Sequence, residues 1–119
     1  MAPQQSFTHV ENELLPKFRK RIDEAESARE VEASFGDCVR ELIGKASAGT
    51  VELAPDDIHL QPETASFLLG EDIRAQEAFK RLWDDSDMPR IVGRFAALAQ
   101  HRHAHLAKKT AKTEAKIRR

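Results

Sequence analysis

Hydrophobic residues recur every three or four positions along most of this chain, a spacing typical of amphipathic α-helices. The first such stretch predicts a turn of helix over residues 8–14, then a kink or restart at Pro16, because a proline inside a helix removes a backbone hydrogen bond and crowds the preceding turn. Helical spacing then continues from 16 to 46. Whether 16–46 is one helix or two helices joined near Ser27 stays open at this level.

Two short motifs predict where helices begin. "THVE", which runs from Thr8 to Glu11, and "SARE", which begins at Ser27, both have the S/T-x-x-E spacing of a reciprocal helix cap. In such a cap, the hydroxyl and the carboxylate each accept a hydrogen bond from a backbone N–H that the helix leaves unpaired. We therefore expect the first helix to begin at Thr8 and a further helical segment to begin at Ser27.

The middle of the chain follows a different pattern. Residues 51–53 and 58–60 alternate apolar and polar side chains, as half-buried strands do, and the intervening "APDD" suits a turn. This pattern predicts a small hairpin over about 50–61, although an isolated two-stranded ribbon is barely stable in water. Pro62 and Gly70 bracket "ETASFLL" and predict a short helix between them.

Helical spacing resumes after this segment. Residues 71–83 form the clearest helical pattern, with acidic side chains in the first turn and basic side chains in the last, which complements the helix dipole. Ser86 or Asp87 is then placed to cap a final helix that runs past residue 105. Because alanine is frequent there, that helix can extend into the last residues of the chain.

The fold class that follows is mainly α: a small bundle of four or five helices, with the short hairpin at about 50–61 as its only sheet. We expect a single helical domain over 1–106 and a basic helical or frayed tail over 107–119. The apolar stripes of the helices should meet in one core. Its expected members are Phe18, Ile22, Val31, Phe35, Val39, Leu42, Ile43, Phe67, Leu69, Ile73, Phe79, Leu82, Trp83, Ile91, Phe95 and Leu98.

Length and composition agree with this picture. With 119 residues, 40% of them hydrophobic and 33% charged, the chain can build one modest core and is too highly charged for a membrane protein. The longest uncharged apolar run, 65–70, is far too short to span a bilayer, and residues 1–15 lack the basic and apolar regions of a secretory signal. We therefore expect a cytoplasmic protein that makes no membrane contact.

The charges are unevenly distributed along the chain. Residues 1–100 carry 12 basic and 19 acidic side chains, whereas residues 101–119 carry 7 basic side chains and a single acidic one. A basic tail of this kind suits phosphates or an acidic protein surface. No aromatic residue follows Phe95, so we expect no base stacking and no sequence-specific reading by the tail. The candidate contact residues are Lys108, Lys109, Lys112, Lys116, Arg118 and Arg119.

Three of the five histidines lie in "HRHAH" at 101–105. His101 and His105 are one helical turn apart, which lets two imidazoles reach a single Zn, Ni or Cu ion, whereas His103 points to another side. A zinc site needs at least three protein ligands, so the remaining ligands would have to come from elsewhere in the fold. His105 is also close in angle to the apolar stripe, which predicts a position at the core boundary, and pH sensing is a further interpretation of the cluster.

Candidate chemistry elsewhere is sparse. Cys38 falls at helical spacing from Phe35 and Leu42, which predicts a small buried hydrophobe. The chain has no phosphate-binding, calcium-binding or nucleophile motif, so the sequence does not favour an enzyme. Strong apolar stripes in so short a chain suggest surface left for a second subunit. The leading hypothesis is a small non-enzymatic interaction or regulatory protein that self-associates through helix faces. The alternatives are metal binding by the His101/His105 pair and non-specific nucleic-acid binding by the tail.

Overall fold

The computed structural model describes residues 6–54, 57–61 and 66–117, with side chains for all of these except 66 and 109–117. Within this part of the chain the fold is mainly helical, with five helices and one two-stranded antiparallel hairpin. This confirms the predicted fold class, a small helical bundle with a short hairpin. The structure also corrects several local expectations.

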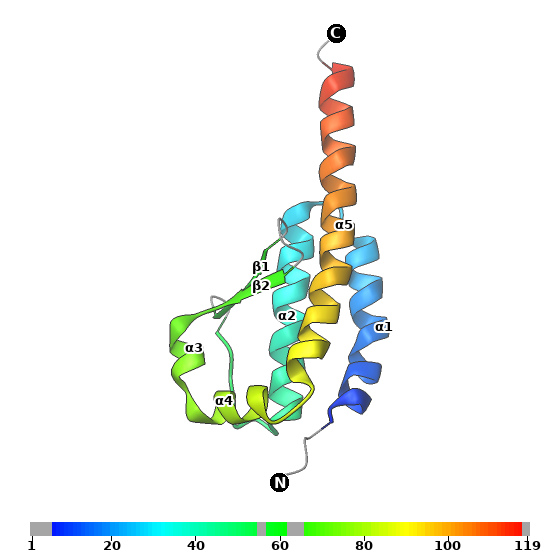
Figure 1. Ribbon diagram of the computed structural model, residues 1–119. Coiled ribbons are helices and arrows are strands. Elements are labelled where there is room, and N and C mark those ends of the chain that lie inside the picture. The colour runs from blue at the N-terminus through cyan, green and yellow to red at the C-terminus, as the bar shows by residue number, and fades with distance from the viewer. Residues whose placement is uncertain (1–5, 55–56, 62–65, 118–119) are drawn as a thin grey trace.

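Three long helices form the body of the molecule (Figure 1). They are α1 (Thr8–Glu24), α2 (Ala28–Ala46) and α5 (Met88–Ile117). The colour gradient in Figure 1 shows that α1 and α5 run in the same direction and that α2 runs opposite to both. The hairpin and the short helices α3 (Glu71–Ala75) and α4 (Glu77–Asp84) lie on the side of α2 and α5 away from α1. Each of the three long helices packs against the other two, so they form a three-helix bundle, and the other elements lie against α2 and α5 (Figure 1).

The core lies where the three long helices meet the hairpin and α4. At its centre the rings of Phe18 and Phe95 stack with their centroids 5.1 Å apart, which joins α1 directly to α5. Twelve of the sixteen predicted core residues are buried, and Phe67, Leu69, Trp83 and Leu98 pack against the core while partly exposed. Further buried hydrophobic residues, outside the predicted core list, are Phe7, Val10, Leu14, Leu15, Ala25, Cys38, Val51, Ile58, Leu60, Met88, Val92, Ala96, Ala99 and Leu106.

The segment from 16 to 46 is divided between two helices. The chain leaves α1 at Ala25, whose ψ of 133° is extended, and re-enters helical structure after Ser27. The Ser27 hydroxyl accepts a hydrogen bond from the backbone N–H of Glu30 at 3.2 Å, and the Glu30 carboxylate accepts one from the N–H of Glu26 at 2.8 Å. The cap predicted from "SARE" is therefore present and marks the start of α2.

The beginning of α1 differs from the prediction in two ways. The helix passes through Pro16 and continues to Glu24, so the expected kink or restart is wrong. Pro16 is exposed, and the carbonyl that loses its partner belongs to Asn12, which is also exposed and can bind water. The reciprocal cap of Thr8 and Glu11 is also wrong, because Thr8 is already helical and Glu11 is buried.

The partner of the Glu11 carboxylate and the cap of the first turn of α1 both come from α5 or from the residue just before it. The Glu11 carboxylate is only 2% exposed and binds two guanidinium groups of α5, that of Arg94 at 3.1 Å and that of Arg90 at 3.5 Å. The first turn of α1 is capped by Asp87, whose carboxylate accepts hydrogen bonds from the backbone N–H of Phe7 at 2.9 Å and from the Ser6 hydroxyl at 3.1 Å. Tertiary contacts thus replace the local cap.

The hairpin lies further along the chain than predicted. Strand β1 (Ile58–Gln61) matches the expected second strand, but its partner is β2 (Ser66–Leu69). Residues 51–53 form no strand, and the predicted helix between Pro62 and Gly70 is a strand in its described part, with 62–65 outside the described residues. The register places Leu60 opposite Phe67 and Ile58 opposite Leu69, so Phe67 and Leu69 lie on the inner face of a ribbon, whereas Leu68 is on its exposed face.

The helix expected over 71–83 is broken at Gln76, whose ψ of 128° is extended. On one straight helix, Ile73 and Leu82 would face opposite sides, because nine residues correspond to two and a half turns. The break turns both residues toward the core, where they are 0% and 8% exposed. Burial of apolar surface therefore outweighs the backbone bonds that are lost at Gln76.

The buried Glu11 predicts an unequal response to removing its partners. In an Arg90→Ala/Arg94→Ala variant the carboxylate stays buried without a counter-charge, and we expect the free energy of unfolding to fall by about 3 kcal/mol. Glu11→Met removes the buried charge itself and leaves two half-exposed arginines in water, so we expect a smaller loss, about 1 kcal/mol or less. Urea denaturation measures both values. Arg19→Ala, on the exposed side of α1, is the control, and an arginine pair that costs no more than this control would contradict the prediction.

Asp87 predicts a pH-dependent contribution to stability. Partial burial opposes its ionisation, but the hydrogen bonds from Phe7, Ser6 and Arg90 together outweigh this and hold the pKa of Asp87 below its usual value. A lowered pKa in the folded state stabilises the fold above the ordinary aspartate pKa, and this contribution disappears as pH falls through the lowered value. Asp87→Ala should therefore cost about 1 kcal/mol at neutral pH, and this cost should shrink as pH falls below the ordinary aspartate pKa.

Thermal or urea unfolding from neutral pH to about pH 3 measures this difference. Asp85→Ala is the matched control, because Asp85 is exposed in the same turn and makes no side-chain hydrogen bond within the described residues. A gap between wild type and Asp87→Ala that stays constant with pH would show that the Asp87 carboxylate is not the capping group.

Candidate interaction surface

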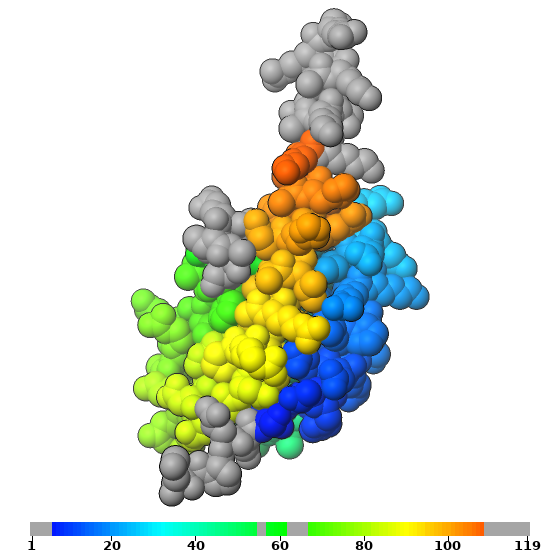
Figure 2. All heavy atoms as spheres, turned by 45° about the vertical axis from the view of Figure 1, so that its right-hand side comes forward, coloured from blue at the N-terminus to red at the C-terminus, as the bar shows by residue number. Residues whose placement is uncertain are grey.

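The most distinctive feature of the fold is the length of α5 beyond the body. Among the described side chains, which end at Lys108, the last buried one is Leu106, yet the helix continues to Ile117, about three further turns or ~16 Å. In Figure 1 this stretch lies beyond the ends of α1 and α2, and in Figure 2 the described residues of α5 form a continuous surface that runs to the tip of the body. The predicted helical tail is therefore helical through Ile117.

Arg102 fixes the point at which α5 leaves the body. Its guanidinium donates hydrogen bonds to the backbone carbonyls of Asp23 and Ala25, both at 3.0 Å. These carbonyls lie at the end of α1, where a helix has acceptors without internal partners and where positive charge is favourable. The arginine thus closes α1 and holds α5 beside it, which sets the direction in which the rest of α5 projects.

The histidine pair lies just before the projecting stretch. His101 and His105 are both exposed, so the expectation that His105 lies at the core boundary is wrong, and its neighbour Leu106 is buried there. His103 is only 18% exposed, with Nε2 3.9 Å from a carboxylate oxygen of Glu32 on α2. Within residues 6–54, 57–61 and 66–117, the structure does not bring these side chains together with further ligands. Among the described residues, no group of three or more His, Cys, Asp or Glu side chains is placed to hold a metal ion.

The predicted contact residues of the tail are only partly within the described side chains. Lys108 is exposed, on the first turn after Leu106. The other predicted contacts lie outside the described side chains, and they are Lys109, Lys112, Lys116, Arg118 and Arg119. The sequence gives residues 107–117 four lysines and one glutamate, so this part of α5 carries a net positive charge.

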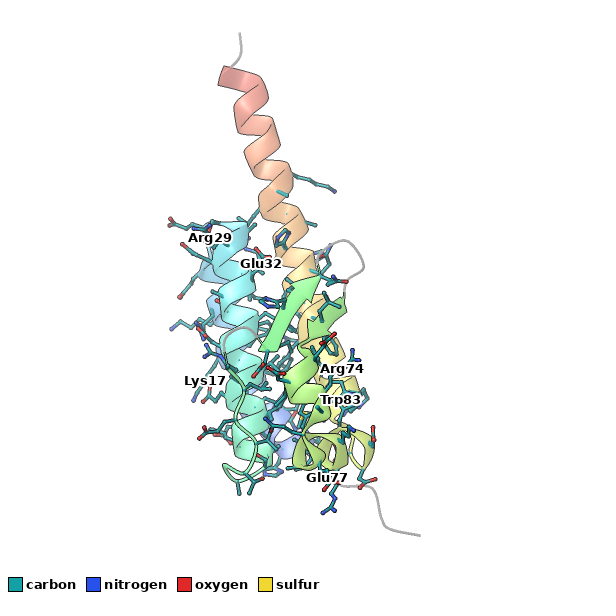
Figure 3. All side chains as sticks on the ribbon, turned by 90° about the vertical axis from the view of Figure 1, so that its left-hand side faces the viewer. Lys17, Arg29, Glu32, Arg74, Glu77 and Trp83 are labelled. Atoms are coloured by element: carbon teal, nitrogen blue, oxygen red, sulfur yellow. The ribbon has the colours of Figure 1, made fainter. Side chains whose placement is uncertain are left out.

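The end of the body beside this point is acidic. Residues 23–32, which join α1 to α2, carry five carboxylates and one arginine. All five carboxylates are exposed, and Figure 3 shows one of them, Glu32, on the part of α2 nearest to α5. We call this set the acidic collar: Asp23, Glu24, Glu26, Glu30 and Glu32. The single arginine of the segment is Arg29, also exposed.

The collar borders a shallow hollow of about 330 Å³ between the end of α1 and the start of α2. Glu24 and Glu30 contribute carboxylates to its rim, and Ala25 and Ala33 contribute apolar surface. This combination suits the aliphatic stem and terminal ammonium of a lysine side chain. Arg21 also lines the hollow but forms an ion pair with Asp37 at 3.1 Å, so it is partly neutralised.

Other surface features add little to this picture. Among the described side chains, Leu68 on the hairpin is the only large hydrophobic residue that is substantially exposed, at 52%. The apolar faces of the body helices are therefore turned inward and offer little surface to a second subunit. Cys38 is buried in α2, as predicted, and burial is the largest cause that raises the pKa of its thiol to about 12, with the nearby Glu41 carboxylate acting in the same direction.

Comparison of the chain with protein-family models, with curated proteins and with solved structures gives no match. Among the described helices, none combines the length and the apolar composition that a membrane-spanning segment needs. Any functional conclusion therefore depends on the geometry and charge of the molecule itself.

The environment of Cys38 predicts an inert thiol. With its pKa near 12 and little access to solvent, the side chain supplies almost no thiolate at about pH 8. We expect iodoacetamide to modify native Cys38 at least about a hundredfold more slowly than the same thiol in urea-unfolded protein. Mass spectrometry of the alkylated protein over time measures both rates. Equal rates in the two states would show that the thiol is accessible and would reopen the question of a nucleophile.

Proposed function

We propose that this protein is a small non-enzymatic interaction protein that self-associates through the projecting part of α5. The observation that carries the proposal is the continuation of α5 to Ile117, beyond the ends of α1 and α2 (Figure 1) and past Leu106, the last buried residue among the described side chains. A cytoplasmic location is part of the proposal, and the single free, buried cysteine suits a reducing compartment.

Helix energetics support a partner for the projecting segment. Isolated helices of this length are marginal in water, because most helix stability in proteins comes from packing. Nothing in the described part of the chain packs against α5 beyond Leu106 (Figure 1). Binding to a second molecule would supply the missing contacts. Because the body exposes so little apolar surface, we place the contact on α5 and not on the faces of the body helices.

Charge supports a second copy as that partner. The projecting segment carries a net positive charge, and the acidic collar of the same molecule carries a net negative charge. In a symmetric dimer, the basic segment of each copy can lie against the collar of the other, which closes the assembly with two equivalent contacts. The hollow beside Glu24 and Glu30 then receives a lysine of the partner copy. Exposed charge pairs of this kind weaken as salt is added.

Sedimentation velocity tests self-association. We expect the full chain to dimerise at about 50 mM salt and to dissociate at about 500 mM, because the Debye length falls from about 14 Å to about 4 Å. A chain that ends at residue 106 should be monomeric at both. A charge swap sharpens the test: Lys112→Glu/Lys116→Glu and Glu24→Lys/Glu26→Lys should each prevent dimerisation, and an equimolar mixture of the two variants should restore it.

The matched control is Glu71→Lys/Glu77→Lys, which makes the same charge change on exposed positions of α3 and α4, away from the collar. This variant should dimerise like the wild type. A full chain that stays monomeric at low salt, or a truncated chain that still dimerises, would overturn the proposal. If the monomeric full chain instead binds a DNA duplex, and truncation abolishes that binding, the nucleic-acid alternative takes its place.

A further inference from the structure

Strand β1 has one edge that no described strand covers. The described sheet has two strands, so β2 occupies only one edge of β1. Next to the paired residues, the N–H of Gly70 donates to the carbonyl of Asp57 at 2.8 Å, which identifies this pair as a hydrogen-bonded one. Bonded and non-bonded pairs alternate in an antiparallel ladder, so His59 is bonded to β2, and Ile58 and Leu60 direct their N–H and C=O groups to the opposite edge.

A groove lies along this free edge. Its volume is about 370 Å³, and it is lined by six residues of α2 between 29 and 40 and by residues 58–60 of β1. Figure 3 shows α2 and β1 side by side, with Arg29 and Glu32 near one end of α2. The α2 side of the groove is about 16 Å long, which equals the length of about five residues in a β-strand. The groove therefore has room for a single extended segment.

The floor of the groove is open at Gly36. A Cβ atom built on Gly36 would meet no atom within 4 Å, and the neighbouring lining residue on α2, Ala33, is small. Glycine inside a helix costs about 1 kcal/mol relative to alanine, and packing within this molecule does not require it at position 36. The absence of a side chain leaves space for a backbone to approach α2 closely.

We propose that the groove between α2 and β1 binds an extended, aliphatic segment of a partner polypeptide, which adds to β1 as a third strand. Only another strand presents donors and acceptors at the spacing of Ile58 and Leu60, and main-chain bonds of this kind supply affinity that depends little on sequence. Because α2 bounds the groove on its far side, a single strand fits there and the hairpin of a second copy does not. The charged side chains of the lining, Arg29, Glu32, Asp37 and Arg40, carry no net charge together, and Arg40 is already paired with Asp37, so recognition depends on the main chain of the partner and not on charged flanking residues.

Amide hydrogen exchange on the full-length protein tests this proposal. The probe is a blocked peptide with valine and threonine in alternation, used at up to about 1 mM. In the free protein, the amides of Ile58 and Leu60 should exchange faster than those of His59 and Gln61, which are bonded to β2. The peptide should slow exchange at Ile58 and Leu60 at least about tenfold and leave His59 and Gln61 unchanged.

Two comparisons show whether binding uses the main chain and this groove. The same peptide with alternate amides N-methylated lacks the required donors and should not bind. Gly36→Leu should lower the affinity of the unmodified peptide at least about tenfold, because a Cβ at this position meets no atom within 4 Å and the added side chain occupies the groove. Gly44→Leu is the matched control: it adds the same side chain to the same helix, also in open space but outside the groove, and should bind like the wild type.

Several results would overturn the proposal. They are slow exchange of Ile58 and Leu60 in the free protein, no binding of the unmodified peptide at about 1 mM, equal binding of its N-methylated form, and equal affinity of the Gly36→Leu variant. None of these four results depends on whether α5 mediates self-association, because the groove and the projecting helix are separate surfaces. The two proposals can therefore fail independently.

Discussion

The fold depends on the packing of α5 against both α1 and α2. The first part of α5 supplies residues to the centre of the core, including Phe95, and also carries the two arginines that hold the buried carboxylate of Glu11. A buried ion pair is weak evidence of stabilisation by itself, because desolvation of the charges offsets their attraction. Its effect here is mainly positional: Glu11 is satisfied only when α1 and α5 are in one register, which sets where the rest of α5 emerges.

The same register of α1 against α5 also places hydrogen-bonding side chains at both ends of α1. Near the start of α1, the Asp87 side chain accepts a hydrogen bond from the backbone N–H of Phe7, and near the end of α1, Arg102 donates to the carbonyls of Asp23 and Ala25. Both residues belong to the segment that forms α5 or immediately precedes it, so α5 and the residue just before it supply bonds to both ends of α1. This explains why the acidic collar stands beside the projecting helix, since the collar follows directly from the end of α1.

The two proposed contact surfaces differ in their physical basis. The projecting segment of α5 combines positive charge with a helix that has no packing partner within the described residues, and its contacts are sensitive to salt. The groove beside β1 offers main-chain hydrogen bonds and a small, open floor at Gly36, and its contacts are short-ranged and little affected by salt. A protein of this size that uses both would join one partner by charge and another by backbone pairing.

Local patterns in the sequence were sufficient for the helices with strong apolar stripes, for the Ser27 cap, for most of the core and for the burial of Cys38, because these features depend on spacing within one or two turns. The sequence also revealed the basic segment of α5 directly from its charges. Tertiary structure alone decided the remaining features. Pro16 is accommodated because it lies on the exposed side of α1, and Gln76 breaks a helix because burial of Ile73 and Leu82 requires it. The strand at 66–69, the burial of Glu11 and the groove beside Gly36 each depend on contacts between segments far apart in the chain, which no local pattern encodes.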